Sequence, residues 1–415
     1  ASDVYKRQHH TCGACADDDH VVTHSFDLFH TGTKIGNNPQ TPSRFRGIIR
    51  PGVSLSDRIA RGCPRRRNEW NKRRDDAGIF LCRNCKSAII HYLCGRKNVL
   101  KVMLSRRLLR TKAIKALYAH LKSEADNMIA TEKTLLASID KAYDLYFQML
   151  VLPVEIARYA EQRQELARRK KLPTHEDLHP NTKFVENEAI RRLADSDAVG
   201  DYVASRKLGW ARNPELIRTL YNRLIETDYY KSYMASETRS LKEDEQLLER
   251  FFASELQECD ALDEALDEQS ILWNDDLGHV LTMVIRTLAA MRQSHKDVKV
   301  LPKFKNDDDL DFVRTLFEKT LINYSENLRY IEKFTRNWDV ERIVFMDNLI
   351  MATALTELVS FPSIPVKVTL DEYIDLSKYY STPGSSTFIN GVLDKIVESL
   401  TQEGKIRKTG RGLIG

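Results

Sequence analysis

The sequence predicts an all-α fold for residues 103–415. Apolar residues recur there at helical spacing in one segment after another, and polar turns separate these segments. No segment alternates between apolar and polar residues for long, so we expect no strands. The first hundred residues lack this periodicity, and we expect them to be irregular.

Charge and cysteine content divide the chain at the same place. Residues 1–102 hold 19 Lys+Arg and 9 Asp+Glu, whereas the rest of the chain holds 45 and 50. Of the 7 cysteines, only Cys259 lies after residue 102. The net charge of +5 for the whole chain therefore describes neither part.

We expect a cytoplasmic protein that does not contact membranes. No apolar run approaches the ~18–20 residues that a membrane span needs. Residues 1–30 also lack the apolar core of a secretion signal.

Two paired-cysteine motifs in the first part raise the alternative of a zinc-dependent nucleic-acid-binding module. Cys12-x-x-Cys15 and Cys82-x-x-Cys85 resemble the thiolate knuckles that bind zinc. The two pairs are separated by 66 residues, far more than the ~12–20 of compact zinc sites. This spacing argues against a zinc site.

A simpler interpretation comes from the string DVYKRQ at residues 3–8. It is the direct translation of GATGTGTATAAGAGACAG, the end of a transposon used to prepare DNA libraries. We therefore expect 1–102 to be an artefactual or disordered N-terminal extension, with the gene starting at or near Met103.

The segment 104–122 predicts a basic amphipathic helix. Its apolar residues have near-helical spacing, and its charged residues are all Lys or Arg. A face of one sign in an otherwise acidic region is either a solvated surface or a contact for a polyanion.

The middle of the chain predicts further helices. A helix that starts near residue 131 is expected to continue, with a bend at Pro153, to about residue 171. Short amphipathic helices follow over 184–273, one of them starting at Asn213-Pro214. The apolar run 277–291 predicts a buried helix.

Local signals predict how the last helices begin. Thr369 and Glu372 have the spacing of a capping box, and Ser385 or Ser386 is expected to cap the following helix. Gly391 lies inside that helix, where glycine costs about 1 kcal/mol relative to alanine. We expect Asn390-Gly391 to mark close helix packing, with RNA contact as the alternative.

Residues 337–395 resemble the NusB transcription antitermination family. The strings are NWDVERIVFMDNLIMATALTEL, FPSIPVKVTLDEYIDLSKYYS and STFINGVLDKI. The basic helix is also similar, since it carries Arg residues and ends in Ala116-Leu117-Tyr118. The resemblance covers about 104–122 and 306–400. It implies a NusB-like helical bundle of a long form: a basic helix (103–122), a helical insertion (123–305), a helical core (306–402) and a basic flexible tail (403–415).

The resemblance implies a binding protein and not an enzyme. Family members bind single-stranded boxA RNA together with the ribosomal protein NusE, and the assembly joins the RNA polymerase antitermination complex. We find no nucleotide-binding, zinc-protease or triad motif, and we expect no cofactor and no metal. A related helical domain precedes the catalytic domain of ribosomal RNA cytosine methyltransferases, which leaves an RNA-binding domain of that class as an alternative.

The resemblance also implies residue roles. Phosphates need basic partners and unstacked bases need flat aromatic ones. Two positions depart from the family pattern, because Gly384 replaces a residue that is often acidic and Ala352 a residue that is often Arg. The expected RNA-binding residues are Arg106, Arg107, Arg110, Lys115, Tyr118, Tyr380, Gly384 and Phe388. The expected structural residues are Trp338, Asp347, Asn390 and Gly391.

Overall fold

The described residues form helices and no strand, which confirms the predicted all-α class. The computed structural model describes residues 102–123, 126–273, 275–293, 297–335 and 344–413. All of them belong to the second of the two compact units into which the chain divides. The two paired-cysteine motifs, the adapter-like string and Trp338 lie outside the described residues.

Most helices follow one another with short connections, and the longest connection spans residues 294–307. The first group is α4 (Arg106–Lys122), α5 (Met128–Arg168), α6 (His175–Leu178), α7 (Glu188–Ala194), α8 (Asp197–Arg206), α9 (Pro214–Glu226), α10 (Asp228–Ala235), α11 (Leu241–Ser254), α12 (Asp260–Gln269), η1 (Ile271–Trp273), α13 (Leu277–Ala290) and η2 (Met291–Gln293). The second group is α14 (Asp308–Ile322), α15 (Tyr324–Thr335), α16 (Phe345–Ser360), α17 (Val366–Tyr380), α18 (Ser385–Gln402) and η4 (Gly410–Leu413).

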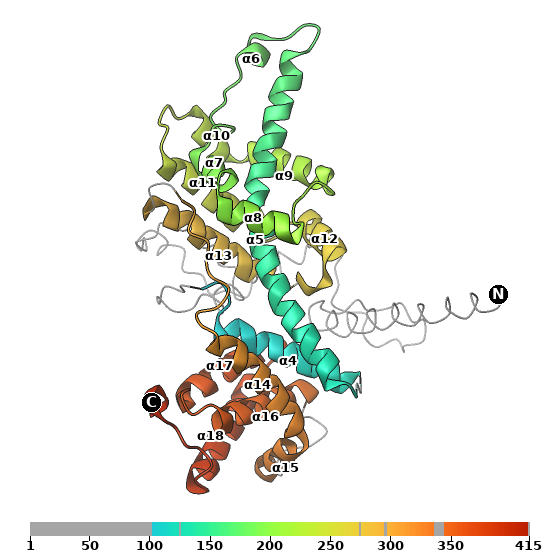
Figure 1. Cartoon of the computed structure of the whole chain (residues 1–415), viewed down its shortest axis with the longest axis vertical. Coiled ribbons are helices and arrows are strands. Elements are labelled where there is room, and N and C mark those ends of the chain that lie inside the picture. The colour runs from blue at the N-terminus through green and yellow to red at the C-terminus, as the bar shows by residue number, and fades with distance from the viewer. Residues whose placement is uncertain (1–101, 124–125, 274, 294–296, 336–343, 414–415) are drawn as a thin grey trace, which may run out of the picture. The chain divides into compact units, whose positions relative to one another are not determined.

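Helix α5 links the two groups. It is 41 residues long and continues through Pro153, as expected for residues 131–171. One end packs against α4 and α14, and the rest packs against α7, α8, α9 and α13 (Figure 1). Its apolar stripe from Leu135 to Ala160 is buried in these contacts. The middle of the chain is therefore packed on the C-terminal helices through α5.

The segment before α4 is tied to the end of the middle region. The backbone N–H groups of Met103 and Leu104 donate to the carbonyls of Pro302 (2.9 Å) and Lys303 (3.1 Å). The imidazole of His279, on α13, donates from Nε2 to the Met103 carbonyl at 2.7 Å. Met103 is fully buried. These bonds fix where α4 begins relative to α13.

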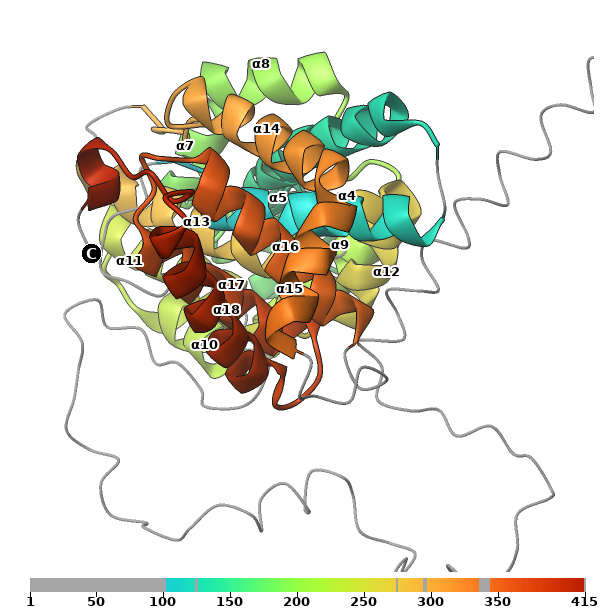
Figure 2. The same cartoon turned by 90° about the horizontal axis from the view of Figure 1, so that it is seen from below.

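Helix α16 forms the centre of the C-terminal group. Most of its residues are buried, because α4, α14, α15, α17 and α18 all pack against it (Figure 2). A helix that is apolar on nearly every side is stable only when other helices surround it. The arrangement places α4 next to α14 and α16, although α4 comes first in the described sequence.

Two local predictions about helix starts are wrong. Helix α17 begins at Val366 after Pro365, so Thr369 lies one turn inside the helix and does not cap it. Its hydroxyl instead donates to Glu357 at 3.0 Å. Helix α18 has Gly384 as its N-cap, and the Ser385 hydroxyl donates to Asp347 at 2.9 Å. In both cases a buried carboxylate on α16 takes the hydroxyl that the pattern assigned to a cap.

The predicted flexible tail makes specific contacts. The Lys408 ammonium donates to the carbonyls of Leu358 and Phe361, at 2.9 Å and 3.1 Å, which lie at the C-terminal end of α16. The Thr409 N–H donates to the Pro362 carbonyl at 3.0 Å. A cation and a donor at this end satisfy carbonyls that have no partner within the helix. These bonds place Lys408 and Thr409 against the end of α16 and the turn after it, and the flexibility expected of the tail stays a prediction.

We predict that Gly412→Ala releases this tail. A Cβ at residue 412 would lie 2.0 Å from the Pro362 carbonyl oxygen, so the tail or the turn must move. We expect a loss of about 1–2 kcal/mol in the free energy of unfolding and faster hydrogen exchange at the Thr409 amide. Gly200→Ala is the control, because nothing lies within 4 Å of a Cβ there. It should stabilise α8 by up to about 1 kcal/mol, and equal effects of the two changes would contradict the prediction.

Candidate nucleic-acid interface

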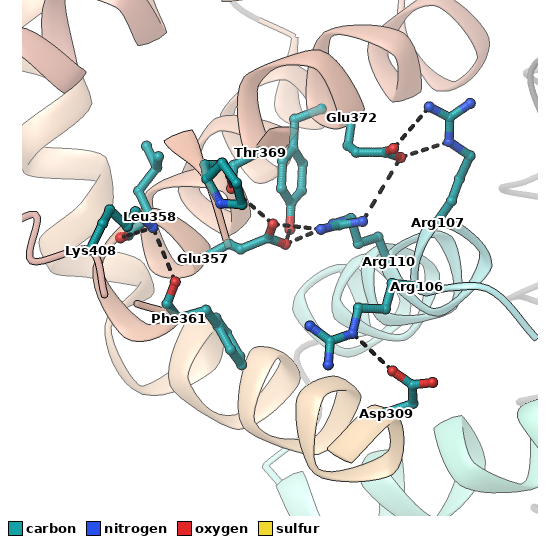
Figure 3. Close-up of polar contacts among 12 residues, drawn as sticks. Arg106, Arg107, Arg110, Asp309, Glu357, Leu358, Phe361, Thr369, Glu372 and Lys408 are labelled. Atoms are coloured by element: carbon teal, nitrogen blue, oxygen red, sulfur yellow. Dashed lines mark hydrogen bonds and ion pairs between the residues drawn. The ribbon is translucent and has the colours of Figure 1, made fainter. Parts of the chain in front are cut away.

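Arg110 is buried against α16 and does not face solvent. It is 3% exposed, and its Nε and Nη2 donate to the Glu357 carboxylate at 2.8 Å and 2.7 Å (Figure 3). Two parallel bonds of this kind are the strongest geometry between Arg and a carboxylate. The expectation that Arg110 holds a phosphate is therefore wrong for this structure, because its guanidinium is already used inside the fold.

The Glu357 carboxylate accepts two further hydrogen bonds. The donors are the hydroxyls of Thr369 (3.0 Å; Figure 3) and Tyr373 (2.9 Å), both on α17. Burial alone would raise the pKa of Glu357, but the charge and hydrogen bonds of Arg110 hold it below the ordinary value. Burial and the adjacent carboxylate together raise the pKa of Tyr373 well above its usual range. The cluster thus holds α4, α16 and α17 together as one charged but satisfied unit.

Arg106 and Arg107 form less buried ion pairs. Arg107 donates to both oxygens of Glu372, at 2.7 Å and 2.9 Å, and Arg106 donates to Asp309 at 2.9 Å (Figure 3). The Arg106 guanidinium also lies 4.9 Å from the centre of the Phe312 ring. The Arg106 side chain is 35% exposed and that of Arg107 is 17% exposed. Both remain at the edge of the molecule, unlike Arg110.

The two lysines of α4 form ion pairs with the middle region. Lys112 pairs with Asp276 and Lys115 pairs with Asp275, both in the turn between η1 and α13. Burial lowers the pKa of Lys112, although Asp276 opposes this shift. For Lys115 burial acts in the same direction, but Tyr380 and Asp275 outweigh it and raise the pKa. Lys115 therefore carries a firmly held charge.

The predicted aromatic residues occupy different environments. The Tyr118 ring is buried and meets the Phe345 ring edge-on at 5.5 Å, so it serves packing. Tyr380 is half-buried, and the Lys115 ammonium lies 5.6 Å from its ring centre. Phe388 is half-buried in the first turn of α18. Tyr380 and Phe388 thus flank the turn that joins α17 to α18.

Asp347, for which the resemblance implies a structural role, contacts both ends of that turn. Its buried carboxylate accepts from the hydroxyls of Ser381 and Ser385. Gly384 lies between them with φ of 96°, a left-handed conformation that side chains rarely adopt. The exposed Gly384 is therefore required by the turn itself.

The packing interpretation of Asn390-Gly391 is wrong. Both residues are exposed, and no atom lies within 4 Å of a Cβ built on Gly391. RNA contact, the alternative considered for this pair, stays a prediction. Ala352, in contrast, is fully buried, and its carbonyl accepts from Asn327 at 3.1 Å.

Three carboxylates that organise this region were not among the expected site residues. They are Glu357, Glu372 and Asp275. Glu357 could have been found, because a single acidic residue inside the apolar run of α16 predicts a buried cationic partner. Asp275 carries no such signal, since its partner is 160 residues away.

The described part of the chain shows no group of three or more His, Cys, Asp or Glu residues that could hold a metal ion. Within the same residues, no helix combines the length and apolar character needed to cross a membrane.

The described residues thus define an all-helical protein with a charged surface around α4 and α17. The NusB family model matches residues 281–398. The chain is 42% identical to the transcription antitermination protein NusB of Salinibacter ruber over 139 residues. These residues are 32% of this chain and 87% of that relative. The chain belongs to the NusB family, and this membership supports a role in transcription antitermination.

Two other relatives are also transcription antitermination proteins NusB. The NusB protein of Natranaerobius thermophilus is 33% identical over 97 residues, which are 23% of this chain and 70% of that protein. That of Chloroherpeton thalassium is 33% identical over 104 residues, 25% of this chain and 49% of that protein. No solved structure matches the chain. The family match starts at residue 281, inside α13, and so begins earlier than the expected boundary at 306.

We predict that Glu357→Ala destabilises the protein strongly. Removing one partner of a buried ion pair leaves the other charge without compensation, at a cost of about 3–5 kcal/mol. Glu165→Ala is the control, because this carboxylate and its partners Arg168 and Arg169 are all exposed, and it should cost less than about 1 kcal/mol. Urea unfolding measures both. Similar losses of unfolding free energy for the two variants would contradict the claim that the buried pair stabilises the protein more than an exposed one.

We also predict a pH dependence for this cluster. The folded pKa of Glu357 lies below its ordinary value of 4.5. Its contribution is therefore fully present above about pH 4.5 and is lost as the pH falls through the folded value. The difference in unfolding free energy between wild type and Glu357→Gln should accordingly shrink below pH 4.5. A difference that stays constant from pH 7 to pH 3 would rule out the ionised carboxylate as its source.

Proposed function

We propose that this protein acts in transcription antitermination by binding a boxA-like single-stranded RNA together with the ribosomal protein NusE. In this proposal the complex acts with RNA polymerase, and the protein contributes binding without catalysis. The proposal rests on membership of the NusB family and on the convergence of expected RNA-binding residues from distant parts of the chain.

The observation that carries the proposal is the contact between Lys115 and Tyr380. The Lys115 ammonium lies 5.6 Å from the Tyr380 ring centre, although the two residues are far apart in sequence. Tyr380 ends α17, and the next turn leads through the exposed Gly384 to Phe388. Basic groups beside a flat aromatic surface are what phosphates and unstacked bases require.

The structure divides the expected residues by accessibility. Arg110 and Tyr118 are buried, so we assign them to packing and not to RNA. The exposed Gly391 lies on α18 three residues, about one turn, after the half-buried Phe388, and we add it to the surface. The proposed RNA-binding surface consists of Arg106, Arg107, Lys115, Tyr380, Gly384, Phe388 and Gly391.

We further propose that residues 123–280 form a helical insertion that supports this surface. We place its end before residue 281, where the family match starts, although the sequence alone suggested residue 305. Helices α5 and α13 pack against each other, and α5 also packs against α4 and α14. An insertion held in this way positions the basic helix.

RNA binding by the full chain tests the proposed function. Fluorescence anisotropy would compare a boxA-like RNA with a scrambled RNA of equal length and composition, with and without NusE. We expect tighter binding of the boxA-like RNA and a further gain with NusE. Residues 1–102 carry 19 Lys+Arg against 9 Asp+Glu, and a positive segment attracts any RNA, so the scrambled RNA is an essential reference. Equal affinity for both RNAs would contradict the proposal.

We predict different signatures for a stacking residue and a phosphate contact. Phe388→Ala should weaken boxA binding by about 1–3 kcal/mol, the range of a base–aromatic stack, with little change in salt dependence. Arg106→Ala should weaken binding to both RNAs and lower the slope of log affinity against log salt by about 0.7, the loss of one phosphate contact. Affinities at four salt concentrations give both quantities. If Phe388→Ala binds like the wild type, the aromatic residue lies off the RNA path.

A further inference from the structure

The turn between η1 and α13 presents two consecutive carboxylates to the basic helix α4. Asp276 pairs with Lys112 and Asp275 pairs with Lys115. Lys112 and Lys115 lie three residues apart on α4, so both face the same turn. The turn belongs to the middle region and precedes the family match that starts at residue 281.

The Asp276 pair anchors the turn. The side chain of Asp276 is 2% exposed and that of Lys112 is 5% exposed. The Asp276 N–H donates to the Trp273 carbonyl at 3.0 Å, and the buried Trp273 indole donates to the Lys141 carbonyl on α5 at 2.7 Å. These bonds anchor Trp273 and Asp276. Asp275 directly precedes the anchored Asp276 and lies next to α4, where it pairs with Lys115.

The Asp275 pair is accessible, in contrast to its neighbour. The side chain of Asp275 is 29% exposed and that of Lys115 is 19% exposed. Ion pairs that reach water contribute less to stability than buried ones, so this pair costs less to open than that of Lys112 with Asp276. An RNA phosphate needs the same ammonium, because Lys115 beside Tyr380 belongs to the proposed RNA-binding surface.

We propose that Asp275 is an intramolecular competitor of RNA, which occupies Lys115 in the free protein and limits the affinity of the surface. The inference rests on the proposed function and names a residue that sets the RNA affinity of the proposed surface. A phosphate that binds Lys115 displaces the Asp275 carboxylate. The negative charges of the phosphate and the carboxylate then repel each other. The buried Asp276 keeps that carboxylate close to the bound RNA, so the repulsion persists in the complex.

The test is Asp275→Asn in the full chain, with binding to a boxA-like RNA measured at several salt concentrations. We expect affinity to rise about two- to fivefold, the range set by the strength of exposed ion pairs. The salt slope should steepen by up to about 0.7, because one more phosphate is neutralised. Glu186→Gln is the control, since it removes a carboxylate that pairs with Arg239 within the middle region. It changes the net charge equally and should leave the affinity unchanged.

A second comparison separates direct competition from a general effect of charge. In a Lys115→Met background, Asp275→Asn should no longer raise the affinity. Asp275→Ser, a shorter neutral replacement, should reproduce the gain of Asp275→Asn if the loss of charge is the cause. Unchanged affinity in both neutral variants, or an equal gain without Lys115, overturns the inference while the proposed function stands. If the wild type does not distinguish boxA-like from scrambled RNA, the proposed function fails, and this inference fails with it.

Discussion

The buried pair of Arg110 and Glu357 is the interaction on which the rest of the arrangement depends. It joins α4 to α16 across 247 residues of sequence, and hydroxyls from α17 complete the shell of the carboxylate. A charge in an apolar helix bundle is tolerated only when its partner is correctly placed. The pair therefore selects one position of α4 on α16. That position in turn brings Lys115 to Tyr380 and Arg107 to Glu372.

The helices could be predicted from sequence because their apolar stripes are local patterns. The long α5, the Asn213-Pro214 start of α9 and the buried α13 all follow from residues close in sequence. The roles of polar residues could not be predicted in this way. Thr369 has the spacing of a cap, but its hydroxyl serves a carboxylate on another helix. A local motif gives no information about a partner that arrives from elsewhere in the chain.

Local patterns were equally insufficient for predicting which residues of the candidate site face solvent. The spacing of Arg106, Arg107 and Arg110 correctly indicates neighbouring positions on α4, and helical geometry makes that prediction secure. Which of the three faces solvent depends on Glu357 and Glu372, from helices far along the chain. For Gly391 the local pattern predicted a packing contact that the structure does not contain. A glycine within a helix suggests a close neighbour, but the surroundings are open, so the glycine has no structural cause within the described residues.

The backbone bonds from Met103 and Leu104 to Pro302 and Lys303 impose an order on folding during synthesis. Helix α4 leaves the ribosome early, but the carbonyls that receive it and the Glu357 carboxylate follow roughly two hundred residues or more behind it. At about 5–20 residues per second, Arg110 waits on the order of 12–50 s for its partner. Until then α4 exposes an apolar stripe and unpaired cations. The packed helices of the middle region can form during this interval, so α4 would dock last, onto a surface that is already folded.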